Sequence, residues 1–344
     1  MENELITRIV GNCGHIVLNR PNALNALTLN MVRRLDTVLR QWSQDDAVLH
    51  VLIEGSGEKG FCAGGDIRAL HDWGKSGAPE ATGFYREEYV VNHLIKTFPK
   101  PYVALMDGVT MGGGVGVSVH GTYRIVTDKT VFAMPETGIG LLPDVGGTYF
   151  LPRLKGKIGT YMALTGARLK AKDCLYAGIA THYVSESEKE ALRLAILECH
   201  DIATVLAPFA HIPDDAPILS YQADIDRLFQ GQTVLEILGA LKADGGEWAQ
   251  SQADIIAQKS PTSCAVALEQ MHRGSVADFE TCLSLEMRAV TRIMAGHDFY
   301  EGVRAVIIEK DNNPKWQPAT FEDISINNIS DMFETLGDKD LILN

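Results

Sequence analysis

The stretch "LHVLIEGSGEKGFCAGGDIRAL", residues 49–70, carries the pattern that decides the fold class. A β-rich apolar run comes first, a glycine cluster follows it, and a helical pattern begins after Asp66. The same order recurs in "PYVALMDGVTMGGGVGVSVHG", residues 101–121, and "YRIVTD" at 123–128 supplies a further strand. Short buried strands that alternate with helical segments predict an α/β fold with much parallel sheet.

The two ends of the chain differ in character. Near the N-terminus, "ELITRIV" and "HIVLN" predict a β-hairpin around the turn "GNCG". From about residue 185 the chain is mainly helical. At 344 residues, one large core with a smaller appendage is the expected plan. We therefore predict a core over residues 1–185 and a helical C-terminal region over 186–344, with an inserted or extended helical segment at about 186–258.

Composition excludes several classes of function. The formal net charge of −13 argues against a nucleic-acid-binding protein, because such a protein needs a basic face. No apolar run approaches the ~20 residues of a membrane span, and the start "MENELITRIV" lacks the features of a secretory signal. The six cysteines form no CxxC pair, and the ten histidines show no ligand spacing. We expect a cytoplasmic protein that binds neither metal, nucleic acid nor membrane.

The two glycine clusters are candidate oxyanion sites. Glycine allows a ligand to approach backbone amides closely, and the first turn of a helix offers unpaired N–H groups. If the clusters converge, one N–H from each makes a two-donor oxyanion hole. A dinucleotide-binding site is excluded, because "MGGGVGVSVHG" contains no G-x-G-x-x-G. A P-loop is excluded as well, because "GEKGFCAGGD" lacks the GK[ST] ending. The alternative is a pair of ordinary glycine turns that end strands.

Two carboxylates stand in the glycine-rich apolar run "FAMPETGIGLLPDVGG", residues 132–147, each directly after a proline. Glu136 taken alone could be a solvated or salt-bridged loop acid, and Asp144 could be the N-cap of a helix after Gly146. Charged side chains are rarely buried without a partner or a purpose. Together, after two oxyanion-type loops, the acids favour a catalytic interpretation, since a carboxyl group in a dry site exchanges protons near neutral pH.

Long motifs in this order resemble the crotonase (enoyl-CoA hydratase/isomerase) superfamily. They are "LNRPNALNALTLNMV", "FCAGGDIRAL", "TMGGGVG" and "AMPETGIGLLPDVGGTYFLPRL". The motifs "REEY", "ALTGARLKAKDCLYAGIATHYV", "SPTS" and "GHDFYEGVRAVIIEKDNNPKWQP" narrow the resemblance to the 3-hydroxyisobutyryl-CoA hydrolase branch. The resemblance covers about residues 5–318. It implies a spiral of ββα units, a helical C-terminal region, a homo-oligomer and an acyl-CoA substrate.

The resemblance also implies roles for individual residues. Gly65 and Gly113 correspond to the oxyanion donors. Hydratases of the superfamily carry one catalytic Glu three residues after the second donor, where this chain has Gly116. The other hydratase Glu corresponds to Glu136, and Asp144 stands where hydratases usually have glycine, as in the hydrolase branch.

Glu88, in "REEY", would by the resemblance contact the acyl hydroxyl of the substrate. From the residues alone, a solvated acid on the face of a helix is the favoured interpretation.

The expected activity is hydrolysis of a short-chain 3-hydroxyacyl-CoA thioester, 3-hydroxyisobutyryl-CoA above all, in valine degradation. Glu136 would act as nucleophile or as general base, and Asp144 would orient the water or protonate the leaving thiolate. No metal or redox cofactor is needed, and CoA is part of the substrate. The alternatives are an enoyl-CoA hydratase or isomerase, and a non-catalytic acyl-CoA-binding subunit.

Overall fold

The computed structural model describes residues 4–209 and 215–343 and confirms an α/β fold. Its contacts divide the chain into two units. Unit 1 comprises the residues up to Asp66, Glu87–Ala133 and Arg168–Pro217, and unit 2 comprises Ile67–Arg86, Met134–Ala167 and the residues from Ile218 onward. The units interleave along the chain. Residue 185, the predicted boundary, lies within the last segment of unit 1 and marks the point where strands give way to helices.

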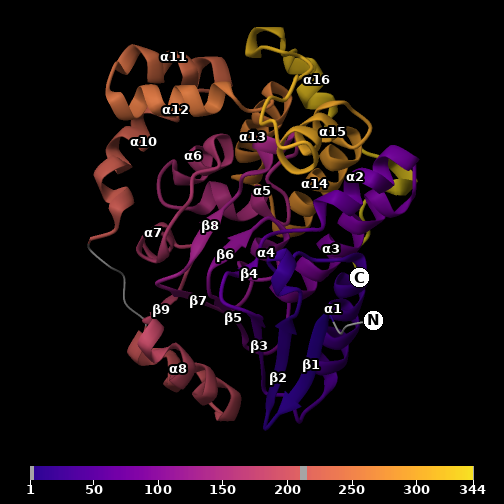
Figure 1. The fold of residues 1–344 in the computed structure, drawn as a ribbon, viewed down its shortest axis with the longest axis vertical. Helices are drawn as coiled ribbons and strands as arrows, with labels where there is room; N and C mark the ends of the chain where they lie inside the picture. The colour runs from indigo at the N-terminus through magenta and orange to yellow at the C-terminus, as the bar shows by residue number, and fades with distance from the viewer. Residues whose placement is uncertain (1–3, 210–214, 344) are drawn as a thin grey trace. The chain divides into compact units, whose positions relative to one another are not determined.

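Unit 1 contains the larger of two sheets, and Figure 1 shows its strands. The strand order is β1-β2-β3-β5-β7-β9; β1 and β2 form the predicted antiparallel hairpin, and every other neighbouring pair is parallel. β5 is buried along its whole length, as expected for a parallel strand that is covered on both faces. The bounds are Leu5–Val10 (β1), Cys13–Leu18 (β2), His50–Gly55 (β3), Tyr102–Met106 (β5), Tyr123–Thr127 (β7) and His182–Val184 (β9).

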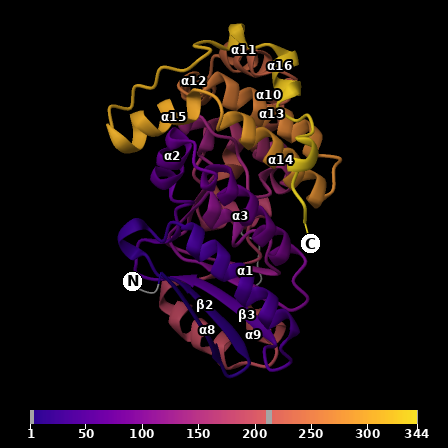
Figure 2. The same ribbon diagram turned by 90° about the vertical axis from the view of Figure 1, so that its right-hand side faces the viewer.

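Helices cover both faces of this sheet, as can be followed in Figure 2. Neighbouring residues of a strand point to opposite faces, so β2 contacts both covers. A Cβ atom at Gly14 would lie 2.5 Å from the ring of Trp42, which is on α1 (Leu29–Gln44). Cys13 packs instead in a buried cluster with α8 (Glu186–Glu198) and α9 (Ile202–Leu206). The first part of the predicted helical insertion therefore belongs to the core of unit 1.

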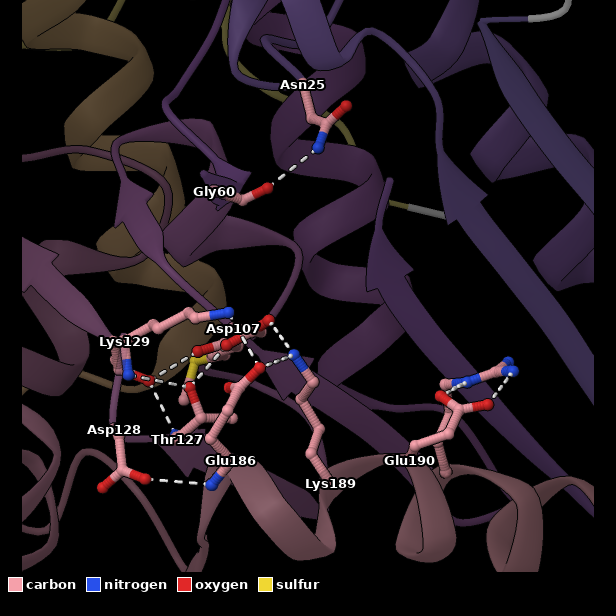
Figure 3. Close-up of polar contacts among 12 residues, drawn as sticks. Asn25, Gly60, Asp107, Thr127, Asp128, Lys129, Glu186, Lys189 and Glu190 are labelled. Atoms are coloured by element: carbon pink, nitrogen blue, oxygen red, sulfur yellow. Dashed lines mark hydrogen bonds and ion pairs between the residues drawn. The ribbon is translucent and has the colours of Figure 1, made fainter. Parts of the chain in front are cut away.

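A smaller parallel sheet in unit 1 consists of β4 (Gly60–Cys62), β6 (Val109–Met111) and β8 (Val131–Ala133). Along the chain, β3, β5 and β7 of the large sheet are each followed by a strand of the small sheet, which is the ββ part of the expected ββα repeat. Asn25 fixes the start of β4. Its buried amide donates to the carbonyls of Ser56 and Gly60, both at 2.9 Å, and Figure 3 shows the second of these bonds.

A charged cluster joins α8 to the ends of β5 and β7, as Figure 3 also shows. Lys189 Nζ donates to Asp107 Oδ2 at 2.6 Å and to Glu186 Oε1 at 3.0 Å. Lys129 donates to the same Glu186 oxygen at 2.8 Å, and Thr127 Oγ1 donates to Asp107 at 2.6 Å. These bonds fix α8 at the edge of the sheet where the strands end.

Unit 2 is helical. α5 packs against α13 and α14, and the approach is close because Gly274 of α13 has no side chain: a Cβ there would lie 1.8 Å from the carbonyl oxygen of Thr148. Ser260 and Asp278 cap α13 and α14 through their side chains. The helices of unit 2 include α2 (Ile67–Ser76), η2 (Glu136–Ile139), α5 (Gly147–Phe150), α6 (Ile158–Thr165), α10 (Gln222–Leu228), α11 (Val234–Asp244), α12 (Glu247–Ala257), α13 (Pro261–Gly274), α14 (Phe279–Ile293), α15 (Asp298–Val303) and α16 (Ile326–Asp331).

Three further features bear on the predicted class of protein. In the described residues, no helix combines the length and the apolar character that a membrane crossing requires. Nor does this part of the chain bring together three His, Cys, Asp or Glu side chains that could hold a metal ion. All six cysteines are free thiols, and all except Cys199 are buried. Burial raises the pKa of Cys13, Cys62, Cys264 and Cys282 to about 12.

Candidate active site

The first glycine loop follows β4 and is held by an earlier segment of unit 1. Leu27 donates its N–H to the carbonyl of Gly64 at 2.8 Å, and Asp66 donates its N–H to the carbonyl of Leu27 at 2.9 Å. Gly64 has a φ of +119°, a conformation that only glycine adopts without strain. Gly65 lies between these anchored residues, so the direction of its peptide group is fixed by the backbone.

The second loop follows β6, the parallel neighbour of β4, and the two loops leave the same edge of the small sheet. Gly112 has a φ of +48°, and α4 (Gly113–Gly116) begins directly after it. A Cβ atom at Gly64 would lie 3.8 Å from the nitrogen of Gly113. The convergence of the two loops is thus confirmed, while the use of Gly65 and Gly113 as oxyanion donors stays a prediction.

Glu88 lies at the second loop. It is on α3 (Glu80–Lys96) and is only 3% exposed, so its interpretation as a solvated helix-face acid is wrong. A Cβ atom at Gly113 would come within 2.5 Å of Glu88 Oε1. The carboxylate therefore occupies the space that a side chain at position 113 would need.

Glu136 begins the 3-10 helix η2 in unit 2 and is 5% exposed, so it is not a solvated loop acid. Its Oε2 atom is buried and has no hydrogen-bond partner within the described residues. Burial raises the pKa of Glu136 well above its ordinary value, and the charges of Asp144 and Glu286 raise the pKa further. A carboxyl group in this environment can exchange protons at neutral pH.

Asp144 is 4% exposed, and its interpretation as the N-cap of the following helix is wrong. The N-cap of α5 is Gly146, which has no side chain; Asp144 contributes its carbonyl oxygen, which accepts from Gly147 N at 2.7 Å. The residues after Asp144 are left-handed, with a φ of +51° at Val145 and +85° at Gly146. Positive φ at a β-branched residue is a genuine outlier, and such strain collects at functional sites.

Glu286 on α14 is a third buried acid of unit 2, and it lies outside the motifs that predicted the site. It is 0% exposed, and its two oxygens accept from the N–H groups of Gly146 and Thr148, both at 2.8 Å. Burial, followed by the charge of Asp144, raises the pKa of Glu286 to about 8. One sequence feature could have indicated Glu286: it is an acid on the apolar face of the helical pattern of α14. The other buried residues of this helix include Phe279, Cys282, Leu283, Ala289, Val290 and Ile293.

Each unit therefore holds its own set of candidate residues. Unit 1 brings Gly65, Gly113 and Glu88 together around the two glycine loops, and unit 2 brings Glu136, Asp144 and Glu286 into one electrostatically coupled group. The first set offers backbone donors beside one acid. The second offers carboxyl groups that cannot all be ionised at neutral pH, because like charges in a buried site oppose one another.

The chain is similar to proteins whose names refer to acyl-CoA chemistry. A family model for enoyl-CoA hydratase/isomerase matches residues 13–333. The mitochondrial 3-hydroxyisobutyryl-CoA hydrolase of Danio rerio is 47% identical over 351 residues, which cover 99% of this chain and 92% of the relative. The corresponding protein of Rattus norvegicus is 45% identical over 98% of this chain and 90% of the relative. The crystal structure of a carnitinyl-CoA dehydratase from Mycobacterium thermoresistibile matches with a TM-score of 0.95, 39% identity and 99% coverage of both chains.

The comparisons correct one prediction. The hydrolases from Danio rerio and Rattus norvegicus are mitochondrial proteins by name, so the expectation of a cytoplasmic protein is wrong. That expectation rested on the composition of the first ten residues and on the scattered cysteines. The scattered cysteines do not distinguish a mitochondrial protein from a cytoplasmic one, because both compartments hold folded proteins with free thiols.

Proposed function

Because the chain belongs to the enoyl-CoA hydratase/isomerase family, we propose that it hydrolyses 3-hydroxyisobutyryl-CoA, or a close short-chain 3-hydroxyacyl-CoA, to the free acid and CoA. The observation that carries the proposal is the identity of the buried acids. The hydratase position three residues after Gly113 is occupied by Gly116, which is buried in α4, whereas Asp144 is buried and coupled to Glu136. This pair suits the activation of water at a carbonyl carbon.

Glu136 acts on the thioester carbonyl by one of two routes. As a nucleophile, its carboxylate oxygen bonds to the carbonyl carbon, CoA leaves as the thiolate, and water then hydrolyses the mixed anhydride. As a general base, it takes a proton from a water molecule whose oxygen attacks the same carbon. Asp144 orients the water or protonates the leaving thiolate. A single turnover in ¹⁸O-labelled water distinguishes the routes, because only the first can place the label in the Glu136 carboxyl group.

The glycine loops of unit 1 stabilise the negative charge that develops on the thioester oxygen. The donors are the N–H groups of Gly65 and Gly113, and each is worth about 2.7–4 kcal/mol of transition-state stabilisation. The fixed geometry of both loops supports this assignment of the two donors. Gly64 and Gly112 have positive φ angles, and the parallel pairing of β4 with β6 holds the loops in register. Glu88, next to Gly113, contacts the hydroxyl of the acyl group.

We place the reaction in valine degradation and expect the protein to act as a homo-oligomer. The proposed chemistry uses carboxyl groups and backbone amides, so it needs no metal or redox cofactor, and CoA enters as part of the substrate.

A hydratase or dehydratase is the second candidate, because one protein of known structure at 39% identity is named a carnitinyl-CoA dehydratase. Addition or removal of water across a C=C bond requires proton transfer at both the α and the β carbon. Gly116 offers no group for one of these transfers. A non-catalytic acyl-CoA-binding subunit is disfavoured by the buried acids, since a binder gains nothing from a carboxyl group whose pKa is raised by burial.

One experiment tests the reaction class. The protein is incubated with 3-hydroxyisobutyryl-CoA and, separately, with crotonyl-CoA, and both free thiol and enoyl absorbance are followed. We expect thiol release from the first substrate and little loss of enoyl absorbance from the second. Rapid hydration of crotonyl-CoA without thiol release would establish the hydratase instead, and no reaction with either substrate, at intact CoA binding, would support the binding subunit.

A further inference from the structure

The turn that carries Asp144 is strained and is held by side chains from other helices. Val145 and Gly146 both have left-handed φ angles, and this conformation is costly for valine because its Cβ is branched. Such a turn persists only where its surroundings over-determine it. Asp144 immediately precedes these residues, so whatever fixes the turn also fixes the direction of the carboxylate.

Two buried side chains hold this turn. Glu286 of α14 accepts from the N–H of Gly146 on Oε2 and from the N–H of Thr148 on Oε1, both at 2.8 Å. Gln270 of α13 donates from Nε2 to the carbonyl of Pro143 at 3.0 Å and to Thr148 Oγ1 at 2.7 Å. The turn is therefore bonded on both sides of Asp144. Of the two side chains, only Glu286 is ionisable.

We propose that Glu286 is a positioning residue for the reaction: by accepting the amides of Gly146 and Thr148 it holds the strained turn that presents Asp144. The proposal deepens the proposed function and rests on it, since it adds a supporting residue to the Glu136–Asp144 pair. A neutral hydrophobic residue at position 286 would leave two buried N–H groups without acceptors, so the acid is required by the backbone of the turn rather than by the packing of α14.

Charge links Glu286 to the pair that it supports. The ionisable groups that face it are Asp144 in the turn, Glu136 at the start of η2 and Cys282 on its own helix, while α13 contributes the neutral amide of Gln270. Asp144 in its charged form disfavours the ionisation of Glu286. The two N–H groups favour it, because a carboxylate is a better acceptor than a carboxylic acid. Ionisation of Glu286 therefore strengthens its hydrogen bonds to the turn and makes the ionisation of Asp144 less favourable.

The first test is kinetic. In Glu286→Gln the side-chain amide can accept from only one of the two N–H groups and presents its own N–H to the other. We expect kcat for thiol release to fall by about 10- to 100-fold, the range for a misplaced catalytic group, with KM within about twofold of wild type. Combining it with Asp144→Asn should give a rate close to that of Asp144→Asn alone, because both changes act on the same carboxylate.

Asp173→Asn is the matched control. Asp173 is a buried acid of unit 1 that accepts a backbone N–H, from Lys170 at 3.3 Å, and it takes no part in the proposed reaction. Its variant should keep the wild-type kcat. A folded Glu286→Gln protein with wild-type kcat, or a double variant whose losses simply multiply, would overturn the positioning role.

The second test uses the wild-type fold and is independent of turnover. With ¹⁵N-labelled glycine and threonine, the amide proton resonances of Gly146 and Thr148 should move together as the pH is raised, because both amides are bonded to the same carboxyl group. In Asp144→Asn the common midpoint should fall to lower pH, since the charge that opposes ionisation of Glu286 has been removed. Independent movement of the two resonances, or an unchanged midpoint, refutes the inference even if Glu286→Gln does not fold.

The outcomes separate this inference from the proposed function. If wild type releases no thiol while the two amides titrate together, the reaction is wrong and the positioning of the turn stands. If wild type releases thiol while Glu286→Gln is fully active, the reaction stands and the positioning role is overturned.

Discussion

Substitution of Glu136 by glutamine should lower the rate and change the pH dependence of stability at the same time. The carboxyl group is 5% exposed, and its Oε2 atom has no hydrogen-bond partner within residues 4–209 and 215–343. The substitution therefore removes charge and basicity while breaking no described bond at Oε2. We expect kcat to fall by at least ~10², the lower end of the contribution of a general base, and KM to change little.

The effect on stability follows from the raised pKa of Glu136. Between its ordinary value of 4.5 and the raised value, the folded chain holds a proton that the unfolded chain has released. The free energy of unfolding of the wild type therefore falls as the pH rises through this window, by about 1.36 kcal/mol per pH unit for one proton. The glutamine side chain of the variant carries no such proton, so the variant should lose stability less steeply than the wild type above pH 4.5.

The assay combines thiol release with unfolding. Initial rates are measured with 3-hydroxyisobutyryl-CoA, and urea unfolding is followed by circular dichroism at several pH values from about 5 to 8, which span the window above the ordinary pKa of a glutamate. Asp173→Asn serves as the control for the loss of a buried carboxylate outside the reacting group. A Glu136→Gln protein with a rate within about threefold of wild type would remove Glu136 from the mechanism, because a general base contributes far more than that. A stability that declines with pH as steeply as in wild type would show that Glu136 is not held protonated by burial.

Three further predictions follow from the same geometry. Asp144→Asn should lower kcat by about 10² while leaving the midpoint of unfolding near that of wild type, because asparagine has nearly the same size and shape as aspartate; a wild-type rate contradicts its role. Gly113→Ala and Gly113→Pro both place an atom against Glu88, but only proline removes the N–H, so the proline variant should be slower than the alanine variant by about 10²–10³-fold; equal rates would mean that this N–H binds no oxyanion. Glu88→Gln should raise KM for 3-hydroxyisobutyryl-CoA but not for isobutyryl-CoA, which lacks the hydroxyl, and an equal effect on both substrates would refute the hydroxyl contact.

The sequence alone was sufficient to predict the longer strands of unit 1. β3 and β5 are nearly continuous apolar runs bounded by glycine or proline, because both of their faces are covered. Such runs can be recognised as strands without knowledge of the partner strand. The strands β4, β6 and β8 have three residues each and lie within or beside the glycine loops. Their identity as strands depends on pairing with one another, which is a long-range property that no local pattern carries.

At the candidate site, the motifs indicated Glu136 and Asp144 but not their support. Asp144 stands two residues before Gly146, a spacing that is close enough to suggest Asp144 itself as the N-cap, and only the observed start of α5 shows that the N-cap is Gly146. Glu286 lies more than a hundred residues further along the chain, within an otherwise ordinary amphipathic helix. Its role depends on which backbone amides face it, and the sequence of α14 contains no information on that.

The buried cysteines have a practical consequence for measuring the reaction. Disulfide reagents react with thiolates, and a thiol whose pKa is raised to about 12, as at Cys13, Cys62, Cys264 and Cys282, is almost entirely protonated at neutral pH. Only Cys199 is partly exposed. A chromogenic disulfide therefore reports the CoA that is released and very little of the protein itself, even when enzyme is in excess over substrate in a single turnover. The same reagent, added without substrate, should label the buried cysteines only as the chain unfolds. The rate of this labelling therefore reports the global unfolding of the protein.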